Sequence, residues 1–210
     1  YRDRYLPVKN SLKVISLYRL GDICLILAMW MSHHLWHENI TFEKLNSASE
    51  VIQHVVEHQG YAFFIATMIV VAAAIKSAQW PFSSWLPRAM EGPTSSSALF
   101  YGALSVHMGV FLLLRTYPYW EIMVGIKGLI IIIGIVTSIT AHLIAGVQSS
   151  VKSQIAYASV AQIGLMMIEV ALGSHALVLI HLAGNMLLRT YQLLVSPSVL
   201  SYALHNMVFD

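Results

Sequence analysis

Residues 76–115 constrain the fold most, because they join two long apolar runs through a polar segment that prolines and a glycine interrupt. Lys76 ends the first run, and the second contains no Lys, Arg, Asp or Glu from Gly92 to Leu114. A membrane chain tolerates such an interruption only where protein or water covers the freed backbone groups. Such places often line pathways for ions or substrates. The stretch therefore predicts a helix that is broken inside a membrane.

Composition supports an integral membrane protein. Hydrophobic residues make up 57% of the 210 residues and charged residues only 10%, whereas ordinary soluble domains are about 25% charged. Mean hydropathy is +0.67. The single cysteine, Cys24, excludes a disulfide framework and is interpreted as a small buried hydrophobe. A formal charge of +2 does not indicate a nucleic-acid partner.

The apolar runs predict an all-α, polytopic membrane helix bundle, since about 20 apolar residues suffice to cross a bilayer. We expect one transmembrane domain over residues 1–210, as a portion of a longer protein, with one helix broken between Lys76 and Pro81. Tyr117-Pro118 is expected to break the chain again, and Pro197 to end the last span. The six predicted spans are residues 12–36, 60–80, 95–115, 121–146, 152–172 and 176–195.

Orientation follows from the basic residues near the first span. Arg2, Arg4, Lys9 and Lys13 precede it, while the segment after it is acidic. Because cytoplasmic loops carry an excess of Lys and Arg, we expect the N-terminus in the cytoplasm. Six spans would then put Lys152 and the C-terminus on the same side.

Lys76 has two interpretations. A lysine at a helix end often extends to the membrane surface. If the helix is instead broken near Pro81 and continues as a second piece, Lys76 lies within the bundle, where an ionisable group indicates function. Spacing alone leaves both open.

The fifth span carries a polar stripe. Lys152, Ser159, Gln162, Met166 and Glu169 are spaced 7, 3, 4 and 3 residues apart, which puts them on one face of a helix. Lys152 could also be a helix-end charge and Glu169 an interfacial one, so burial with a functional role and surface placement both remain open.

The sixth span carries a second polar ridge, since His181, Asn185 and Arg189 follow one another at four-residue intervals. Polar groups facing lipid would be unsatisfied, so this ridge is predicted to face the bundle, as a hydrated path or a subunit contact. Tyr101 and His107 add polar groups on the third span. Histidine can exchange protons near neutral pH, so Lys, His, Tyr and water together can form a proton relay.

Catalytic apparatus of the soluble kind is missing from the sequence. It contains no HExxH, GxGxxG, P-loop, GxSxG or paired carboxylates, so we expect no catalytic residues, no metal and no cofactor. His33, His34 and His37 lie beside Trp30 and Trp36, which is more typical of an aromatic belt than of a metal site.

Three segments, in order, resemble landmarks of the antiporter-like proton-translocating membrane proteins: KSAQWPFSSWLPRAMEGPTSSSAL, VKSQIAYASVAQIGLM and HLAGNMLLR. That family includes the large membrane subunits of respiratory complex I, the Mrp-type cation/proton antiporter subunits, and subunits of membrane hydrogenases and inorganic-carbon uptake complexes. The opening LKVISLYRLGDICLIL fits as well. Members are longer, so the chain corresponds to a middle portion.

The resemblance implies site residues. Lys76 matches the lysine at the family's broken helix, Lys152 the second lysine of its central axis, and His181 a histidine on the next helix. The glutamate partner of Lys76 would lie before Tyr1, so we expect the chain to lack an acidic partner for it. The residues assigned to a proton or ion path, partly by this resemblance and partly by spacing, are Lys76, Lys152, His181, Glu169, Tyr101, His107, Asn185 and Arg189.

Two functions follow as expectations. The first is translocation of protons or monovalent cations, as a subunit of a larger complex in a bilayer, with a bacterial inner membrane expected and an NADH:quinone oxidoreductase-type translocase as one setting. The second is a membrane scaffold or coupling subunit of an inorganic-carbon (DAB-type) complex without standard pumping. Tyr101 and Asn185 stand where many members have histidine, and Arg189 where lysine is common, which motivates this alternative. A stand-alone quinone enzyme ranks last.

Overall fold

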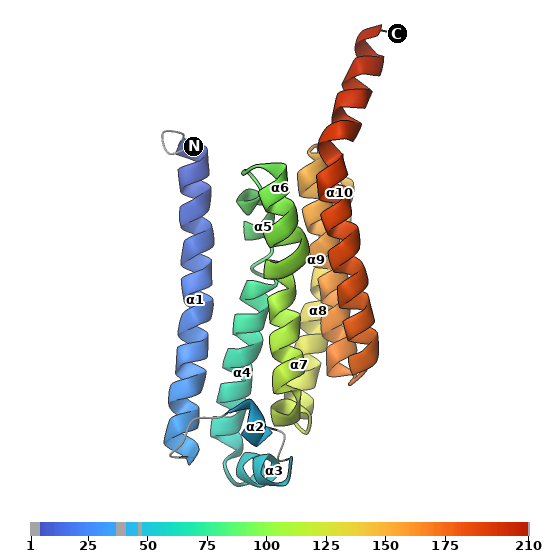
Figure 1. The fold of residues 1–210 in the computed structure, drawn as a ribbon. Helices are drawn as coiled ribbons and strands as arrows, with labels where there is room; N and C mark the ends of the chain where they lie inside the picture. The colour runs from blue at the N-terminus through green and yellow to red at the C-terminus, as the bar shows by residue number, and fades with distance from the viewer. Residues whose placement is uncertain (1–4, 37–40, 46–47, 210) are drawn as a thin grey trace.

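The computed structural model describes residues 5–36, 41–45 and 48–209, and throughout this part of the chain the regular structure is helical. Six long helices run antiparallel, which confirms the all-α membrane bundle (Figure 1). The elements are α1 (Tyr5–Trp36), α2 (Phe42–Leu45), α3 (Ala48–Glu57), α4 (Gln59–Lys76), α5 (Trp85–Ala89), α6 (Thr94–Ser97), η1 (Ala98–Leu104), η2 (Ser105–His107), α7 (Met108–Trp120), α8 (Val124–Gly146), α9 (Val151–Ala171) and α10 (His175–Phe209).

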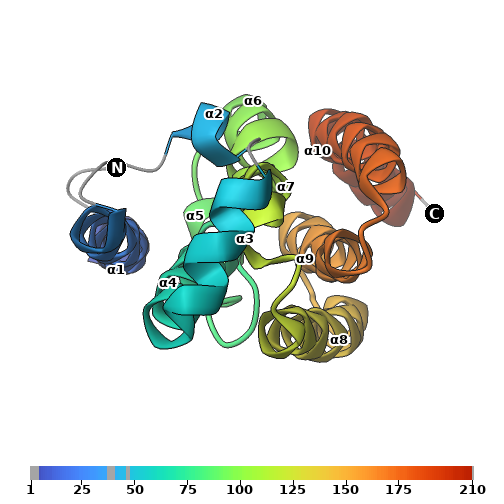
Figure 2. The ribbon, with the colours of Figure 1, turned by 90° about the horizontal axis from the view of Figure 1, so that it is seen from below.

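The bundle has an open side and a dense side. Seen along its axis, α1 lies at one edge next to α4, while α9 is enclosed by α7, α8 and α10 (Figure 2). The short helices α2 and α3 cover one end, and α5 and α6 lie at the other. Both ends of the described chain lie at that second end, as six crossings require (Figure 1).

Two proline predictions are wrong. Pro118 lies inside α7, which continues to Trp120, and Pro197 lies inside α10, which continues to Phe209. Pro118 falls in the last turn, so its missing N–H removes the helical bond to the Leu114 carbonyl only two residues before α7 ends. At Pro197 a neighbour compensates: the Ser196 hydroxyl donates to the Leu193 carbonyl, the one that the N–H of a non-proline residue 197 would have bound.

The break after α4 is confirmed, and its backbone groups are satisfied by side chains. The helix ends at Lys76, and Ala78 takes a positive φ of 53°. The Trp85 indole N–H donates to the Ile75 carbonyl at 2.9 Å, and the Trp80 N–H donates to the Thr137 hydroxyl at 3.0 Å. These bonds meet the requirement that irregular backbone at membrane depth be covered by protein.

The third span is a composite of α6, η1, η2 and α7. In η1 the helix widens to π geometry, and the Ser105 N–H donates to the Phe100 carbonyl five residues earlier. Such widened turns are frequent at functional sites. The following turn, η2, carries His107 into the bundle, where only 3% of its surface stays exposed.

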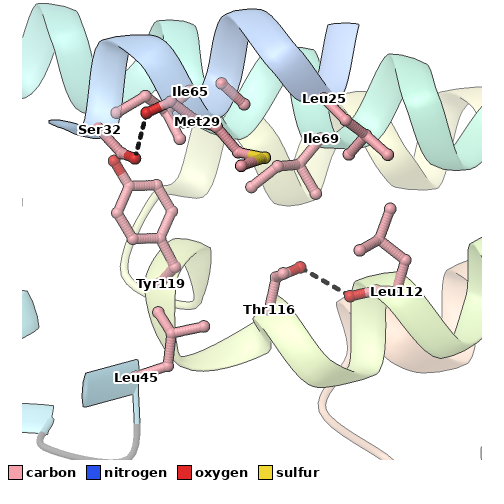
Figure 3. Close-up of a pocket in the computed structure, with 10 residues that line it drawn as sticks. Leu25, Met29, Ser32, Leu45, Ile65, Ile69, Leu112, Thr116 and Tyr119 are labelled. Carbon is pink, nitrogen blue, oxygen red and sulfur yellow. Dashed lines mark hydrogen bonds between the residues drawn. The ribbon is translucent and has the colours of Figure 1, made fainter. Parts of the chain in front are cut away.

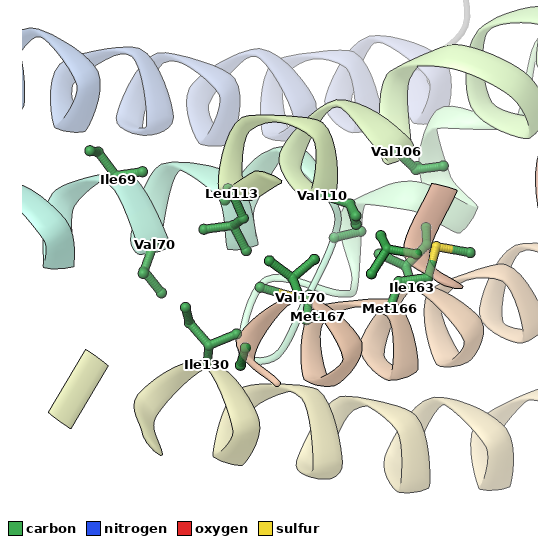
Figure 4. Close-up of a cluster of buried hydrophobic side chains, with 14 of the residues drawn as sticks. Ile69, Val70, Val106, Val110, Leu113, Ile130, Ile163, Met166, Met167 and Val170 are labelled. Carbon is green, nitrogen blue, oxygen red and sulfur yellow. The ribbon is translucent and has the colours of Figure 1, made fainter. Parts of the chain in front are cut away.

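The core lies where α4, α7, α8 and α9 meet, and aliphatic and methionine side chains fill it (Figure 4). Helices α8 and α9 approach most closely at two glycines. A Cβ added to Gly134 would come within 2.6 Å of the Gly164 carbonyl oxygen, and one added to Gly164 within 2.8 Å of the Gly134 oxygen. Small residues at a contact let membrane helices pack backbone to backbone.

Candidate functional site

Lys76 has an acidic partner inside the chain, contrary to the expectation from the sequence. Its Nζ lies 2.9 Å from Asp22 Oδ1, so α4 and α1 are joined by a charge-assisted hydrogen bond. The two side chains are 23% and 36% exposed. We call Lys76 and Asp22 the outer pair.

The position of the outer pair decides between the two interpretations of Lys76. Asp22 lies near the middle of the 32-residue α1, and α4 ends part-way along the bundle with α5 and α6 beyond it (Figure 1). Lys76 is therefore at the break and at the depth of the bundle, rather than at a helix end facing the membrane surface.

Two further side chains on α1 surround the outer pair. Arg19 Nη1 lies 3.3 Å from Asp22 Oδ2, with the arginine side chain 77% exposed. The Tyr18 ring lies under Lys76, whose Nζ is 4.3 Å from the ring centroid. The Tyr18 hydroxyl is 2.6 Å from the hydroxyl of Ser105, so a hydrogen bond runs from α1 to η2.

Lys152 lies at the end of the bundle to which the break leads. Its Nζ donates to the carbonyls of Met90 and Gly92 at 3.2 and 2.8 Å, in the turn between α5 and α6. The second lysine of the predicted path thus fixes the segment that follows the broken helix.

Glu169 and His181 meet on the dense side of the bundle. Glu169 Oε1 of α9 is 2.8 Å from His181 Nδ1 of α10, and the side chains are 19% and 22% exposed. Gln162, two stripe positions earlier on α9, places its Oε1 3.0 Å from His181 Nε2. Both predicted stripes therefore face each other, and we call Glu169 and His181 the inner pair.

The inner pair admits more than one proton arrangement. With Glu169 ionised, Nδ1 donates to it, while Nε2 donates to the Gln162 oxygen or, after the Gln162 amide turns over, accepts from its N–H₂ group. With Glu169 protonated, its O–H donates to Nδ1 and neutral His181 donates only to Gln162. The second carboxylate oxygen, Oε2, is buried without a hydrogen-bond partner among the described residues. This geometry can hold or pass on one proton.

His107, Asn185 and Arg189 form one connected set. Asn185 Nδ2 is 3.0 Å from His107 Nε2, and Arg189 Nε donates to Asn185 Oδ1 at 3.2 Å. Arg189 also donates to Gln192 and to the Ala158 carbonyl of α9. The ridge on the sixth span faces the bundle, as predicted.

Tyr101 is placed by aromatic contacts. Its ring centroid lies 6.2 Å from that of Trp85 in an edge-on contact, and the Tyr18 ring makes a similar contact with Trp85 at 5.1 Å. Tyr101 thus adjoins the break rather than the inner pair.

Sequence reasoning missed Asp22 as a partner and Tyr18 altogether. Both lie on the first span, one turn apart, in LYRLGD, and the available signal was a charge in a run otherwise suited to lipid.

An apolar cavity of about 280 Å³ lies apart from these polar groups, between α1, α4 and α7 (Figure 3). Thr116 and Ser32 direct their hydroxyls to carbonyls of their own helices, so the walls are mainly aliphatic. Among the residues that the structure describes, no group of three His, Cys, Asp or Glu side chains could hold a metal ion.

Comparison with known proteins agrees with this architecture. The family model described as "NADH:quinone oxidoreductase/Mrp antiporter, TM" matches residues 2–206. The chain is 32% identical over 209 residues to the chloroplastic NAD(P)H-quinone oxidoreductase subunit 5 of Ranunculus macranthus, covering 98% of this chain and 28% of the relative. The corresponding protein of Chara vulgaris is 34% identical over 193 residues, covering 90% and 28%.

Solved structures show the same fold. The Mrp complex from Dietzia sp. DQ12-45-1b contains a chain that matches with a TM-score of 0.79 at 23% identity, over 91% of this chain and 21% of that one. A chain of an archaeal membrane-bound sulfane sulfur reductase matches with a TM-score of 0.76 at 21% identity, over 89% and 32%. The chain spans under a third of the length of each of these proteins.

Proposed function

The chain belongs to the NADH:quinone oxidoreductase/Mrp antiporter transmembrane family, and on that premise we propose that it forms part of the route by which a larger membrane complex moves protons across the bilayer. Because the family description includes the word antiporter, exchange of a monovalent cation for protons is a variant of this proposal. Its partners are the other subunits of that complex, and its surroundings are lipid.

The observation that carries the proposal is the presence of two ionisable pairs on opposite sides of one bundle. Lys76–Asp22 joins α4 to α1, and Glu169–His181 joins α9 to α10. Ionisable residues inside a membrane are costly and commonly mark proton relays. Each pair can lose or gain a proton by exchanging a charged for a neutral arrangement.

A ring contact and two hydrogen bonds lie between the outer pair and the inner one. Tyr18, in contact with Lys76, bonds Ser105, and His107 follows two residues later. Asn185, on α10, bonds His107 and lies one turn beyond His181. We assign Lys76, Glu169 and His181 to proton exchange, Lys152 to the end of the route near α5 and α6, and Tyr101 to the aromatic wall beside the break.

Replacing Lys76 by Ala in the full-length protein, within its assembled complex, tests the proposal. We expect proton translocation in proteoliposomes to fall more than tenfold, since a positioned proton-transfer group typically contributes a factor of 10² or more. Lys9→Ala is the matched control, because Lys9 is an exposed lysine on α1, the helix that also carries Asp22. Unchanged translocation by a normally assembled Lys76→Ala complex would contradict the proposal.

A second function is favoured by Asn185 and Arg189. Neither an amide nor a guanidinium releases protons readily, so the chain can also serve as a membrane scaffold or coupling subunit, for instance of an inorganic-carbon uptake complex. That function predicts that Lys76→Ala and Lys152→Ala leave both partner binding and partner activity intact.

A further inference from the structure

The hydrogen bonds around His107 all run from donor to acceptor in one order, from Arg189 to Asn185, then to His107, then to Ala103. Arg189 Nε lies 3.2 Å from Asn185 Oδ1, Asn185 Nδ2 lies 3.0 Å from His107 Nε2, and His107 Nδ1 lies 3.0 Å from the Ala103 carbonyl oxygen. His107 and Asn185 are 3% and 5% exposed, and Arg189 is 9% exposed. Water has little access to compete with these bonds.

The identity of each donor follows from the two ends of the set. A guanidinium can only donate, so the atom of Asn185 that faces Arg189 is its oxygen. The amide N–H₂ of Asn185 therefore faces His107 and donates to Nε2. At the other end a carbonyl can only accept, so His107 Nδ1 carries the proton. His107 is neutral, with Nε2 as an acceptor.

A second proton on His107 has no place in this arrangement. A proton on Nε2 would point at the N–H₂ group of Asn185, and two donors would face each other in a buried site. Rotating the amide by 180° would relieve this clash but would turn the same N–H₂ group toward Arg189 Nε. Arg189 is itself held by Gln192 and by the Ala158 carbonyl.

His107 occupies the position between the two ionisable pairs. On one side, Gly109 packs against Ala73 and Ser77 at the end of α4, and Ser105 bonds Tyr18, which touches Lys76. On the other side, Asn185 lies one turn from His181 along α10. On the proposed function, a proton that follows the contacts from Tyr18 and Ser105 to Asn185 would meet this ring.

We propose that Arg189, through Asn185, locks His107 in its neutral Nδ1–H tautomer and so blocks proton transfer between the outer and inner pairs in the state that the structure describes. Arg189 and Asn185 are positioning residues, acting on His107 rather than carrying protons. The lock opens when Arg189 leaves Asn185, because the amide can then rotate and accept from Nε2. The block to proton transfer rests on the proposed function, whereas the tautomer of His107 is inferred from the hydrogen bonds alone.

The tautomer is tested by nitrogen NMR of ¹⁵N-histidine-labelled full-length protein in its assembled complex, with His107→Gln used to identify the signals. We expect native His107 to show a protonated Nδ1 and an unprotonated Nε2. In Asn185→Asp, a carboxylate replaces the donor and can only accept, so Nε2 should become protonated. A native His107 with a protonated Nε2, or a spectrum unchanged by Asn185→Asp, would overturn the lock.

Proton flux tests the consequence. Asn185→Asp should raise proton flux in proteoliposomes about tenfold, a modest share of what one positioned acid–base group contributes. Asn185→Leu, of similar volume, is the control: it removes the donor without supplying an acceptor and should leave the flux low. If Asn185→Asp leaves Nε2 of His107 protonated but does not change the proton flux, the proposed block would be contradicted. Absence of flux in native protein and variants alike, with the native tautomer as expected, would overturn the proposed function and leave the lock standing.

Discussion

The α1–α4 side and the α8–α9–α10 side of the bundle hold their polar groups in different ways. The outer pair joins α4 to the edge helix α1. Asp22 contacts both Lys76 and Arg19, and 36% of its side chain is exposed. The inner pair lies between α9 and α10 with Glu169 and His181 19% and 22% exposed, whereas the members of the His107 set are at most 9% exposed.

The difference concerns how easily a proton can be exchanged. The Lys76 ammonium group contacts the Asp22 carboxylate and the Tyr18 ring, and its side chain is 23% exposed. Its surroundings can therefore adapt to a change of charge. His107 lies in a set of hydrogen bonds whose directions are fixed by the Arg189 guanidinium and the Ala103 carbonyl, so a change of its charge requires a change of structure. The open side is therefore suited to uptake or release, and the dense side to control.

The largest effect should come from disturbing the dense side alone. Gly134→Ala places a methyl group 2.6 Å from the Gly164 carbonyl oxygen, so α8 and α9 must separate. We expect the free energy of unfolding to fall by about 1–3 kcal/mol, as for other overpacked contacts. Thermal denaturation of the purified full-length protein measures this.

Gly21→Ala is the matched change on the open side. Its Cβ would lie 3.4 Å from Ile75, an ordinary contact, so we expect no loss of stability. Equal destabilisation by the two alanines would remove the distinction between the two sides.

Asp22→Asn should have the next largest effect. It leaves the Lys76 ammonium group without the carboxylate that it contacts at 2.9 Å. We expect proton translocation to fall about tenfold, the scale of one lost charge-assisted hydrogen bond. Arg19→Gln serves as the control, because Arg19 is mostly exposed, and should change translocation little. Similar losses in both variants would mean that Asp22 acts through Arg19.

Glu169→Gln should reduce translocation less, by about fivefold, the scale of one hydrogen bond between neutral groups. The reason is that neutral His181 can still donate from Nε2 to Gln162 and accept at Nδ1 from the new amide, so the hydrogen bonds of the ring are kept. A loss larger than that of Asp22→Asn would reverse the roles given to the two sides. The comparison uses the same proteoliposome assay.

Tyr18→Phe should have the smallest effect, about twofold, because it removes one hydroxyl bond and keeps the ring next to Lys76. Tyr18→Leu removes both and should reduce translocation further. If Phe and Leu behave alike, the ring contributes nothing and only the bond to Ser105 matters.

The sequence predicted the parts of the fold that depend on apolar length and helical spacing. The six spans, the break after Lys76 and the inward face of α10 follow from these properties and are confirmed. For α9 the spacing put the polar groups on one face but left their burial open, and the structure places Gln162 and Glu169 against His181. The assigned roles of the path residues stay predictions.

Other features depend on contacts between distant residues, which spacing along the chain cannot give. Pro197 stays helical because Ser196 satisfies one carbonyl, and Asp22 meets Lys76 across 54 positions. The directed bonds around His107 likewise need the widened turn of η1 to bring His107 against α10.

The end of α4 at Lys76 has an electrical consequence. The aligned peptide dipoles of an 18-residue helix place about half an elementary negative charge at its C-terminal end. In an unbroken helix that charge would lie at the membrane surface, whereas here it lies in the bundle, next to the ammonium group of Lys76. Together with Asp22, the break therefore supplies more than one unit of opposing charge. The break in the helix thus contributes an electric field that favours a cation at this position.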